Sequence, residues 1–444
     1  MSKKKVAVIS LGCDKNRVDT EKMLFSLTDG DGYEITQDTS QADILLVNTC
    51  GFIESAKKES IDAILDMAQI KKEFPEKKLV VAGCLSQRYG KELFEEIKEA
   101  DAVIGIEGRH YIREVVGKLE NGNKRILDTG KTGGGFQKGR VITTPYHYAY
   151  LKIADGCDNR CSYCVIPLIR GSYRSERMED ILEEADSLVE QGVKELILVA
   201  QDTTLYGKDL YGAPMLKELI NKLSQIKDIW KIRLLYAYPE RVDRELIEII
   251  SQNPKVAKYI DIPLQHINDA ILKRMNRKTL SDGIKDKLKM IKDIDGDIAV
   301  RSSFIIGFNG EDRQKYLELK DFLAHTREID YAGFFGYSIE EGSPASRFIE
   351  GNVDQAEIDR RVEDIQKLWS QKTIALHQKY AGKTLEVIYE GIDYDKMLFY
   401  GRNEHNAPDI DTKVYFSARK PLEIGGIYKV KITRADFDLY GHAI

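Results

Sequence analysis

Three of the six cysteines in this 444-residue chain lie close together, and their spacing could support metal chemistry. Cys157, Cys161 and Cys164 form a C-x3-C-x2-C pattern directly after a predicted strand at residues 148–154. Thiolates are soft ligands that hold iron–sulfur clusters. Three thiolates on one loop can bind three irons of a cubane and leave the fourth iron open to a small molecule. The pattern therefore favours an iron–sulfur cluster.

Zinc, disulfide and purely structural interpretations of these three cysteines fit less well. Tetrahedral zinc needs a fourth ligand, and no histidine occurs in the ten residues after Cys164. A disulfide would leave one thiol over. The close spacing, together with the position after the first strand of a βα series, favours a cluster over buried structural cysteines.

The other three cysteines are widely separated, but each follows a predicted strand. Cys13, Cys50 and Cys84 come after apolar runs at 6–10, 44–48 and 79–82, and Gly12 and Gly83 precede two of them. Open α/β sheets bind ligands at the carboxyl ends of their strands, so three successive units bring these thiols to one edge. A lone cysteine at a strand end is most often a small buried residue. Three in succession favour a shared metal site.

The elements that position these cysteines form two βα series. The first has strands at 6–10, 44–48, 79–82 and 103–106 with helical patterns such as 55–70 between them, which predicts a doubly wound α/β sheet. The second has strands at 148–154, 196–201, 232–238, 260–265, 300–308 and 332–338. Six βα units predict a partial TIM-like barrel, a (βα)6 barrel open on one side.

The remaining segments define the domain boundaries. We expect an N-terminal domain at 1–128, a Gly-rich linker at 129–144, a barrel domain with a connecting helix at 145–376 and a small all-β barrel at 377–444. The amphipathic helix is predicted at 355–380, and the last strands at 384–389, 397–400, 414–416, 428–432 and 439–444. The Gly-rich stretch could also hold a phosphate, but it lacks the Walker spacing.

Composition narrows the class of protein. The chain has 67 Lys and Arg residues against 72 Asp and Glu residues, a formal net charge of −5, so no overall basic field exists to hold nucleic acid. Apolar residues at 42% and charged residues at 31% exclude wholesale disorder, collagen and coiled coil. The first residues lack the apolar core and the small-residue cleavage site of a signal peptide, and no run of about 18 apolar residues occurs. We therefore expect a cytoplasmic protein.

The clustered cysteines resemble the signature of the radical S-adenosylmethionine (SAM) enzymes, in which an aromatic residue, here Tyr163, precedes the last cysteine. The resemblance implies that SAM binds the open iron of a 4Fe-4S cluster and that Tyr163 lies near its adenine. Gln201, Gln265 and Arg301, at or near the ends of predicted strands, are candidate SAM contacts, or else satisfied structural residues. The Gly-Gly-Glu that usually follows the second barrel strand is replaced here by residues 199–202, Val-Ala-Gln-Asp.

Two three-cysteine sites narrow the resemblance to the radical SAM methylthiotransferases, whose N-terminal domain holds a second 4Fe-4S cluster and whose C-terminal β-barrel is called TRAM. Other similar segments are 164–171, 264–266, 274–277 and 304–308. The resemblance implies two clusters and SAM. An electron from the first cluster cleaves SAM to methionine and a deoxyadenosyl radical, and the second cluster holds the sulfur that SAM methylates. No side-chain acid or base is implied.

Two branches of this family differ in substrate, and the sequence resembles the one that modifies the β-carbon of an aspartate in a small-subunit ribosomal protein. Segments 157–161, 200–207, 406–411 and 438–441 carry this resemblance. Residues 379–444 contain ten basic and ten acidic residues, a neutral balance that suits a protein partner better than tRNA. Asp409 and Asp411 are candidate contacts to a basic substrate, unless they only solvate a loop.

The expected partners follow from the same resemblance. They are the ribosomal protein, free or on the ribosome, and an electron donor such as flavodoxin or ferredoxin, with the chain acting as a monomer away from membranes. Two alternatives stay open: a tRNA adenosine methylthiotransferase, and a non-catalytic iron–sulfur protein that binds RNA or the ribosome.

Overall fold

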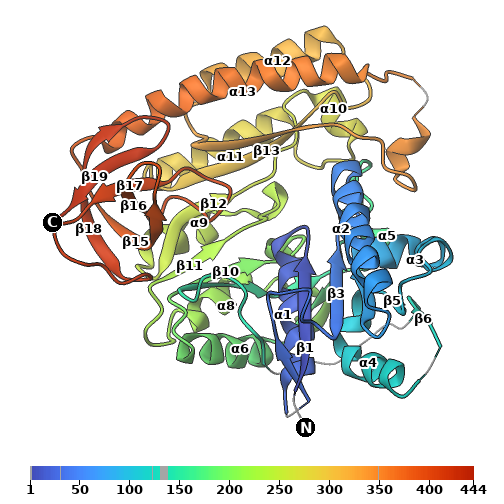
Figure 1. Ribbon diagram of the computed structural model, residues 1–444. Coiled ribbons are helices and arrows are strands. Elements are labelled where there is room, and N and C mark those ends of the chain that lie inside the picture. The colour runs from blue at the N-terminus through green and yellow to red at the C-terminus, as the bar shows by residue number, and fades with distance from the viewer. Residues whose placement is uncertain (1–2, 31, 123, 131–138, 349) are drawn as a thin grey trace.

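The chain folds into three parts in sequence order, each built around its own sheet (Figure 1). The computed structural model describes residues 3–30, 32–122, 124–130, 139–348 and 350–444. The predicted fold class is confirmed: an N-terminal doubly wound sheet, a central open βα barrel and a small closed β-barrel. Residues 131–138 of the predicted linker lie outside the described residues. Among the described helices, none has a length and apolarity suited to crossing a membrane.

In the part of the chain that the structure describes, the N-terminal sheet has six parallel strands. Their spatial order is β2 (Tyr33–Ile35), β1 (Lys4–Ser10), β3 (Ile44–Thr49), β4 (Lys78–Gly83), β5 (Ala102–Ile104) and β6 (Ile126–Asp128). The four predicted strands overlap β1, β3, β4 and β5, and the last of them was predicted to extend two residues beyond the end of β5. The edge strands β2 and β6, three residues each, were not predicted.

Helices cover both faces of this sheet and bury two separate apolar clusters. They are α1 (Asp14–Thr28), α2 (Glu54–Glu73), α3 (Cys84–Glu96) and α4 (Ile112–Glu120). The central strands β3 and β4 are buried along almost their whole length because both of their faces are covered, which is the pattern from which they were predicted.

Among the described residues, the central sheet also has six parallel strands. Their order is β14 (Tyr331–Gly336), β13 (Ala299–Ile306), β12 (Val256–Asp261), β11 (Lys231–Leu234), β10 (Glu195–Val199) and β7 (Tyr148–Lys152). Each predicted strand of the second series overlaps one of them. The main outer helices are α6 (Met178–Glu190), α8 (Leu216–Leu223), α9 (Arg244–Gln252), α11 (Ser281–Ile294) and α12 (Arg313–His325). Shorter elements are β8 (Ala154–Asp155), β9 (Arg174–Ser175), α5 (Ile166–Arg170), α7 (Lys208–Tyr211) and α10 (Asp269–Arg274).

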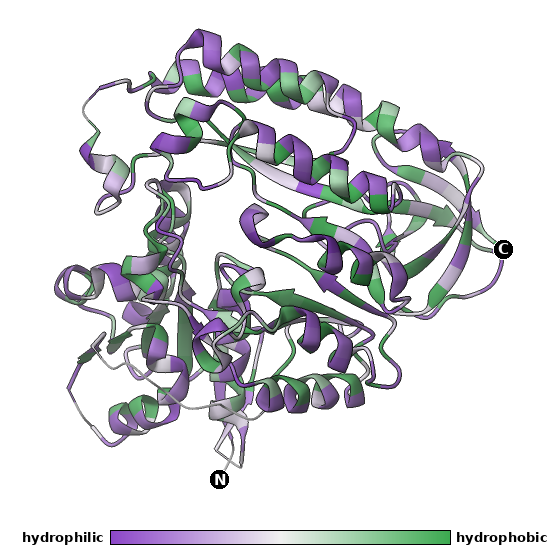
Figure 2. Cartoon of the chain, turned by 180° about the vertical axis from the view of Figure 1, so that it is seen from behind, coloured by the Kyte–Doolittle hydropathy of each residue, from purple (hydrophilic) through white to green (hydrophobic). Residues whose placement is uncertain are grey.

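The open side of the barrel is covered by the N-terminal domain, because α1 packs against β7. Val18 of α1 joins the apolar cluster formed by the inward-facing side chains of the barrel, among them Tyr148 and Tyr150. Figure 2 shows the apolar strands enclosed by helices whose outward faces are largely hydrophilic.

The C-terminal part is a closed barrel joined to the central sheet by a long helix. Within residues 377–444, all of them described, the barrel order is β15 (Thr384–Asp393), β16 (Leu398–Arg402), β17 (Val414–Ser417), β19 (Leu439–Ala443) and β18 (Ile427–Ala435). The predicted helix is α13 (Gln355–His377), which continues as one 3-10 turn over Gln378–Tyr380. It buries Ile358, Ile365 and Trp369.

A buried ion triad attaches the closed barrel to the base of the central sheet. Glu195 at the start of β10 accepts from Arg233 of β11 at 2.7 Å and from Arg402 of β16 at 2.8 Å. The side chain of Glu195 has no solvent exposure, and that of Arg402 is 2% exposed. Arg402 also donates to Glu390 at 2.8 Å. Because these charges are desolvated, they stabilise the interface only as a complete set.

Replacing Glu195 by Gln should therefore loosen this interface. Arg233 loses its only carboxylate partner in the described residues, and we expect a loss of about 3–5 kcal/mol, measured as a lower thermal midpoint and as faster protease release of residues 377–444. The matched control is Glu248→Gln, which removes an exposed pair with Arg244 and should change stability by less than about 0.5 kcal/mol. Equal behaviour of the two variants would contradict the assignment.

The ion triad around Glu195 also predicts how the free energy of unfolding depends on pH. Burial would raise the pKa of Glu195, but Arg233 and Arg402 lower it to about 2. The folded-state pKa lies below the unfolded value of about 4.3, so this stabilisation is complete above that pH and is lost as the pH falls toward 2. Between a pH of about 4.3 and a pH of about 2, the free energy of unfolding should therefore fall less steeply in Glu195→Gln than in the wild type.

Candidate functional site

The three dispersed cysteines lie at one edge of the N-terminal sheet. Cys13, Cys50 and Cys84 follow the neighbouring strands β1, β3 and β4, as the sequence predicted. Thr49 pairs with Gly83 in the parallel register, so Cys50 and Cys84 leave their strands at the same level. Helix α1 begins directly after Cys13, and α3 begins at Cys84. Helix N-termini carry positive partial charge, which favours thiolates.

Gly12 allows the first two of these strand ends to approach closely. Its φ is +86°, and a Cβ at this position would lie 2.7 Å from Cys50 Cβ and 2.9 Å from Cys50 Sγ. A side chain of any size would therefore push Cys50 away. The backbone at Gly51 is equally close to the start of α3, where a Cβ would lie 2.8 Å from Leu85 Cα.

The clustered cysteines occupy the loop between β8 and α5, which is held by hydrogen bonds with two other segments of the barrel. The Ser162 amide donates to Met275 O at 3.0 Å, and its hydroxyl donates to Arg274 O at 2.7 Å. The Tyr238 hydroxyl lies 2.5 Å from Cys161 Sγ. The segment 274–277, which carries part of the family resemblance, is thus the support for this loop.

The donor chemistry of both triads suits an iron–sulfur cluster. As the described side chains stand, no group of three or more His, Cys, Asp or Glu side chains is arranged to hold a metal ion. Burial raises the pKa of Cys157 to about 11 and that of Cys84 to about 12, although Arg170 lowers the latter. These thiols are therefore protonated at neutral pH, and a bound metal would have to displace their protons.

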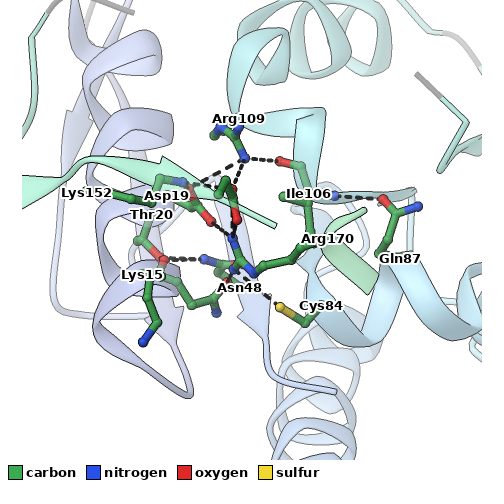
Figure 3. Close-up of polar contacts among 12 residues, drawn as sticks. Lys15, Asp19, Thr20, Asn48, Cys84, Gln87, Ile106, Arg109, Lys152 and Arg170 are labelled. Carbon is green, nitrogen blue, oxygen red and sulfur yellow. Dashed lines mark hydrogen bonds and ion pairs between the residues drawn. The ribbon is translucent and has the colours of Figure 1, made fainter. Parts of the chain in front are cut away.

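A buried charge network joins the N-terminal domain to the barrel beside the two triads (Figure 3). It consists of Asp19 on α1, Arg109 after β5, Lys152 and Asp155 at the end of the first barrel strand, and Arg170 on α5. Arg170 lies 3.0 Å from both carboxylates, and Lys152 contacts both as well. Arg109 lies 3.6 Å from Asp19 and 3.5 Å from Asp155.

The network is desolvated and contacts a cysteine of the N-terminal triad directly. Every side chain in it is 6% exposed or less. Burial alone would raise the pKa of Asp155, but Arg170, Lys152 and Arg109 hold it well below its ordinary value. Arg170 also donates to Cys84 Sγ at 3.4 Å. One guanidinium thus contacts Asp155 of the barrel as well as Asp19 and Cys84 of the N-terminal domain.

Sequence analysis missed this network, although two signals were present. Asp155 stands two residues before Cys157, and Arg170 stands six residues after Cys164. Charged residues at fixed offsets from metal-ligating cysteines are candidates for tuning or positioning the metal site. Asp19 and Arg109 had no local signal, because their partners are distant in the sequence.

Two of the four candidate SAM contacts, Gln201 and Gln265, follow the carboxyl ends of β10 and β12, whereas Arg301 lies near the amino end of β13. Gln201 donates to Asp155 at 3.3 Å, while its buried Oε1 has no partner among the described residues. Gln265 follows β12 with a φ of +74°. Arg301 on β13 donates to Asp261 at 3.2 Å, and Tyr163 packs edge-on against Phe308. Their role in SAM binding stays a prediction.

The structure separates the two candidate substrate contacts on the closed barrel. Asp409 is exposed, with a φ of +65°. The side chain of Asp411 is 1% exposed, accepts from the Tyr259 hydroxyl at 2.8 Å and lies 3.4 Å from Arg301. Its loop enters the base of the open barrel, so the prediction that Asp411 meets a partner protein is wrong in this conformation. Local sequence could not reveal partners more than 100 residues away.

Three family models match the chain in the order of its three parts. The model of an uncharacterized protein family, UPF0004, matches residues 5–105, that of the radical SAM superfamily matches residues 151–323, and that of the TRAM domain matches residues 381–444. These ranges fall on the N-terminal sheet, the open barrel and the closed barrel.

Solved structures share the fold at low identity. The radical SAM methyltransferase TsrM from Kitasatospora setae, with cobalamin and a 4Fe-4S cluster bound, aligns with a TM-score of 0.58 at 14% identity, covering 79% of this chain and 78% of that one. The cobalamin-dependent SAM radical enzyme OxsB aligns with a TM-score of 0.53 at 14% identity, covering 84% of this chain and 58% of that one. At such identities the likeness concerns the fold alone.

Curated relatives match over their whole length, and they confirm the resemblance drawn from the motifs. The ribosomal protein uS12 methylthiotransferase RimO of Acetivibrio thermocellus is 46% identical over 453 residues, covering 100% of this chain and 99% of the relative. Those of a Thermoanaerobacter species and of Clostridium botulinum are each 45% identical and cover 99% of this chain, and 99% and 98% of their own lengths. The chain belongs to the RimO family of radical SAM methylthiotransferases.

Proposed function

We propose that this chain transfers a methylthio group to the β-carbon of an aspartate in ribosomal protein uS12. The observation that carries the proposal is the full-length identity of about 45% to enzymes named for this reaction. The two cysteine triads support it, and Arg170 contacts both Cys84 of one triad and Asp155, two residues before Cys157 of the other. The proposal includes two 4Fe-4S clusters, SAM, an electron donor such as flavodoxin or ferredoxin, and action as a monomer.

The residues have separate tasks in this proposal. Cys157, Cys161 and Cys164 would hold one cluster, and Cys13, Cys50 and Cys84 the other. Bound there, the clusters would supply the electron that cleaves SAM and the sulfur of the methylthio group. The buried charge network fixes one triad relative to the other, which keeps the reacting groups at one distance. Gln201 offers an unpartnered buried acceptor to SAM.

The substrate is tested by offering two candidates to the same enzyme. The anaerobically reconstituted chain, with SAM and a reductant, should add a methylthio group to uS12 and none to tRNA, as measured by mass spectrometry. In a strain lacking the gene, uS12 should lose the modification. A methylthio group on tRNA adenosine alone would move the assignment to the tRNA branch, and absence of SAM cleavage would favour a non-catalytic iron–sulfur protein.

The two proposed clusters should be separable by mutation. Alanine at Cys157, Cys161 and Cys164 should abolish SAM cleavage, because the open iron that binds SAM is lost. Alanine at Cys13, Cys50 and Cys84 should leave uncoupled SAM cleavage but no methylthio product. Each triple variant should hold about four irons, against about eight in the parent. Eight irons in either triple variant would refute the ligand assignment.

Asp409 is the exposed candidate for contact with the substrate protein. Reversing its charge in Asp409→Lys should weaken the binding of the basic protein uS12 by roughly 1 kcal/mol, about fivefold in Kd, and reduce the salt dependence of binding. Asp395→Lys, an equal charge reversal on the exposed β15–β16 turn, is the control. Equal Kd values for the two variants and the wild type, from titrations at two salt concentrations, would remove Asp409 from the interface.

A further inference from the structure

A lysine beside the first cysteine of the N-terminal triad is buried between the two domains. Lys15 stands two residues after Cys13, and its side chain is 8% exposed. Its Nζ lies 2.9 Å from Asp14 Oδ1 and 3.3 Å from the centroid of the Tyr236 ring. The Tyr236 hydroxyl donates to the same Asp14 oxygen at 3.3 Å. These three side chains bring α1 against the segment that follows β11.

This cluster is linked along the chain to both cysteine triads. Asp14 and Lys15 directly follow Cys13. On the barrel side, Tyr236 is two residues before Tyr238, whose hydroxyl lies 2.5 Å from Cys161 Sγ. One short segment of chain therefore touches the Lys15 cluster with one tyrosine and the clustered triad with the other. A group held by Lys15 would therefore lie close to Cys13 and to the segment that contacts Cys161.

Two atoms of the cluster are free to contact a ligand. An ammonium group has three N–H donors, and the contacts of Lys15 in the described residues, with Asp14 and with Tyr236, leave one of them. The side chain of Asp14 is 6% exposed, and its Oδ2 atom is buried. This oxygen has no hydrogen-bond partner in the described part of the chain. A buried carboxylate oxygen without a donor is costly unless a ligand supplies one.

The ligand that fits must therefore offer an acceptor to a cation and a donor to a carboxylate within a short distance. An aspartyl residue within a polypeptide has both: its side-chain carboxylate accepts, and its own or the next backbone N–H donates. We propose that Lys15 binds the carboxylate of the target aspartate and that Asp14 accepts one of the backbone N–H groups beside it. This inference rests on the proposed function and names the contact that selects its substrate.

The chemistry of an aspartyl side chain gives this contact a purpose. The β-carbon is bonded directly to the carboxyl carbon, so fixing the carboxylate fixes the reacting carbon to within one bond. Holding a reactant in one orientation contributes to rate through avoided entropy loss. A buried ammonium also favours an aspartate over a neutral isostere such as asparagine, because a charged carboxylate accepts a stronger hydrogen bond from its free N–H than an amide oxygen does.

A binding experiment tests the contact by changing Lys15 in the chain and, separately, the target residue in the peptide. The reconstituted chain and its variants are titrated with a uS12 peptide that contains the target aspartate, and with the same peptide carrying asparagine. The wild type should bind the aspartate peptide at least about tenfold more tightly. Lys15→Met should bind both peptides with equal affinity, and Lys15→Arg should keep part of the preference, because it keeps the charge.

Two controls separate substrate binding from a merely structural role. Lys22→Met removes an equally buried lysine on the same helix, paired with Glu184 at 3.1 Å, and should keep the full preference for aspartate. The double variant Asp14→Asn with Lys15→Met leaves no lone buried charge, so it stays informative if Lys15→Met alone unfolds. It should also bind the two peptides equally.

The outcomes distinguish this inference from the proposed function. If the wild type methylthiolates uS12 and Lys15→Met, or the double variant, still prefers aspartate by the wild-type factor, the role of Lys15 is refuted and the function stands. If the wild type modifies tRNA and not the peptide, the proposed function fails and this contact fails with it.

Discussion

The buried charge network is the interaction on which the arrangement of the site depends. Charges taken out of water are costly, and their mutual attraction offsets that cost only when every partner is in place. Because the network draws its members from α1, β7, β8, α5 and the segment after β5, it is complete only when the N-terminal domain covers the open side of the barrel. An apolar interface could tolerate a shift of one residue, whereas this one specifies a single docking position.

The network also couples that docking position to the cysteines. Within it, Arg170 places a buried guanidinium beside Cys84, at 3.4 Å from its Sγ (Figure 3). A thiolate at Cys84 would complement this charge, whereas a neutral thiol does not. If the N-terminal triad binds a metal, its thiolates and the docking of the domain on the barrel would therefore favour each other.

The parts of this molecule that could be predicted from sequence are those fixed by local pattern. Near-continuous apolar runs located β1, β3 and β4 because both faces of these strands are covered, and the same runs placed Cys13, Cys50 and Cys84 at one edge. The short edge strands β2 and β6 have no such run and were missed. Asp411 was misjudged because its partners, Tyr259 and Arg301, come from distant strands. Long-range pairing of charges is the component that local pattern does not carry.

Backbone strain completes the geometry between the two triads. Tyr236 adopts a φ of +58°, which costs a non-glycine residue on the order of 1–3 kcal/mol and persists only where neighbouring contacts hold it. Here Asp261 at the end of β12 holds it: its carboxylate accepts from the Tyr236 amide at 3.1 Å, and its carbonyl accepts from the Ala237 amide at 2.8 Å. The reversal lets two tyrosines, two residues apart, reach different domains. A relaxed extended strand would place both on the same face of the sheet, so the strained residue is what allows one segment to contact Asp14 beside one triad and Cys161 in the other.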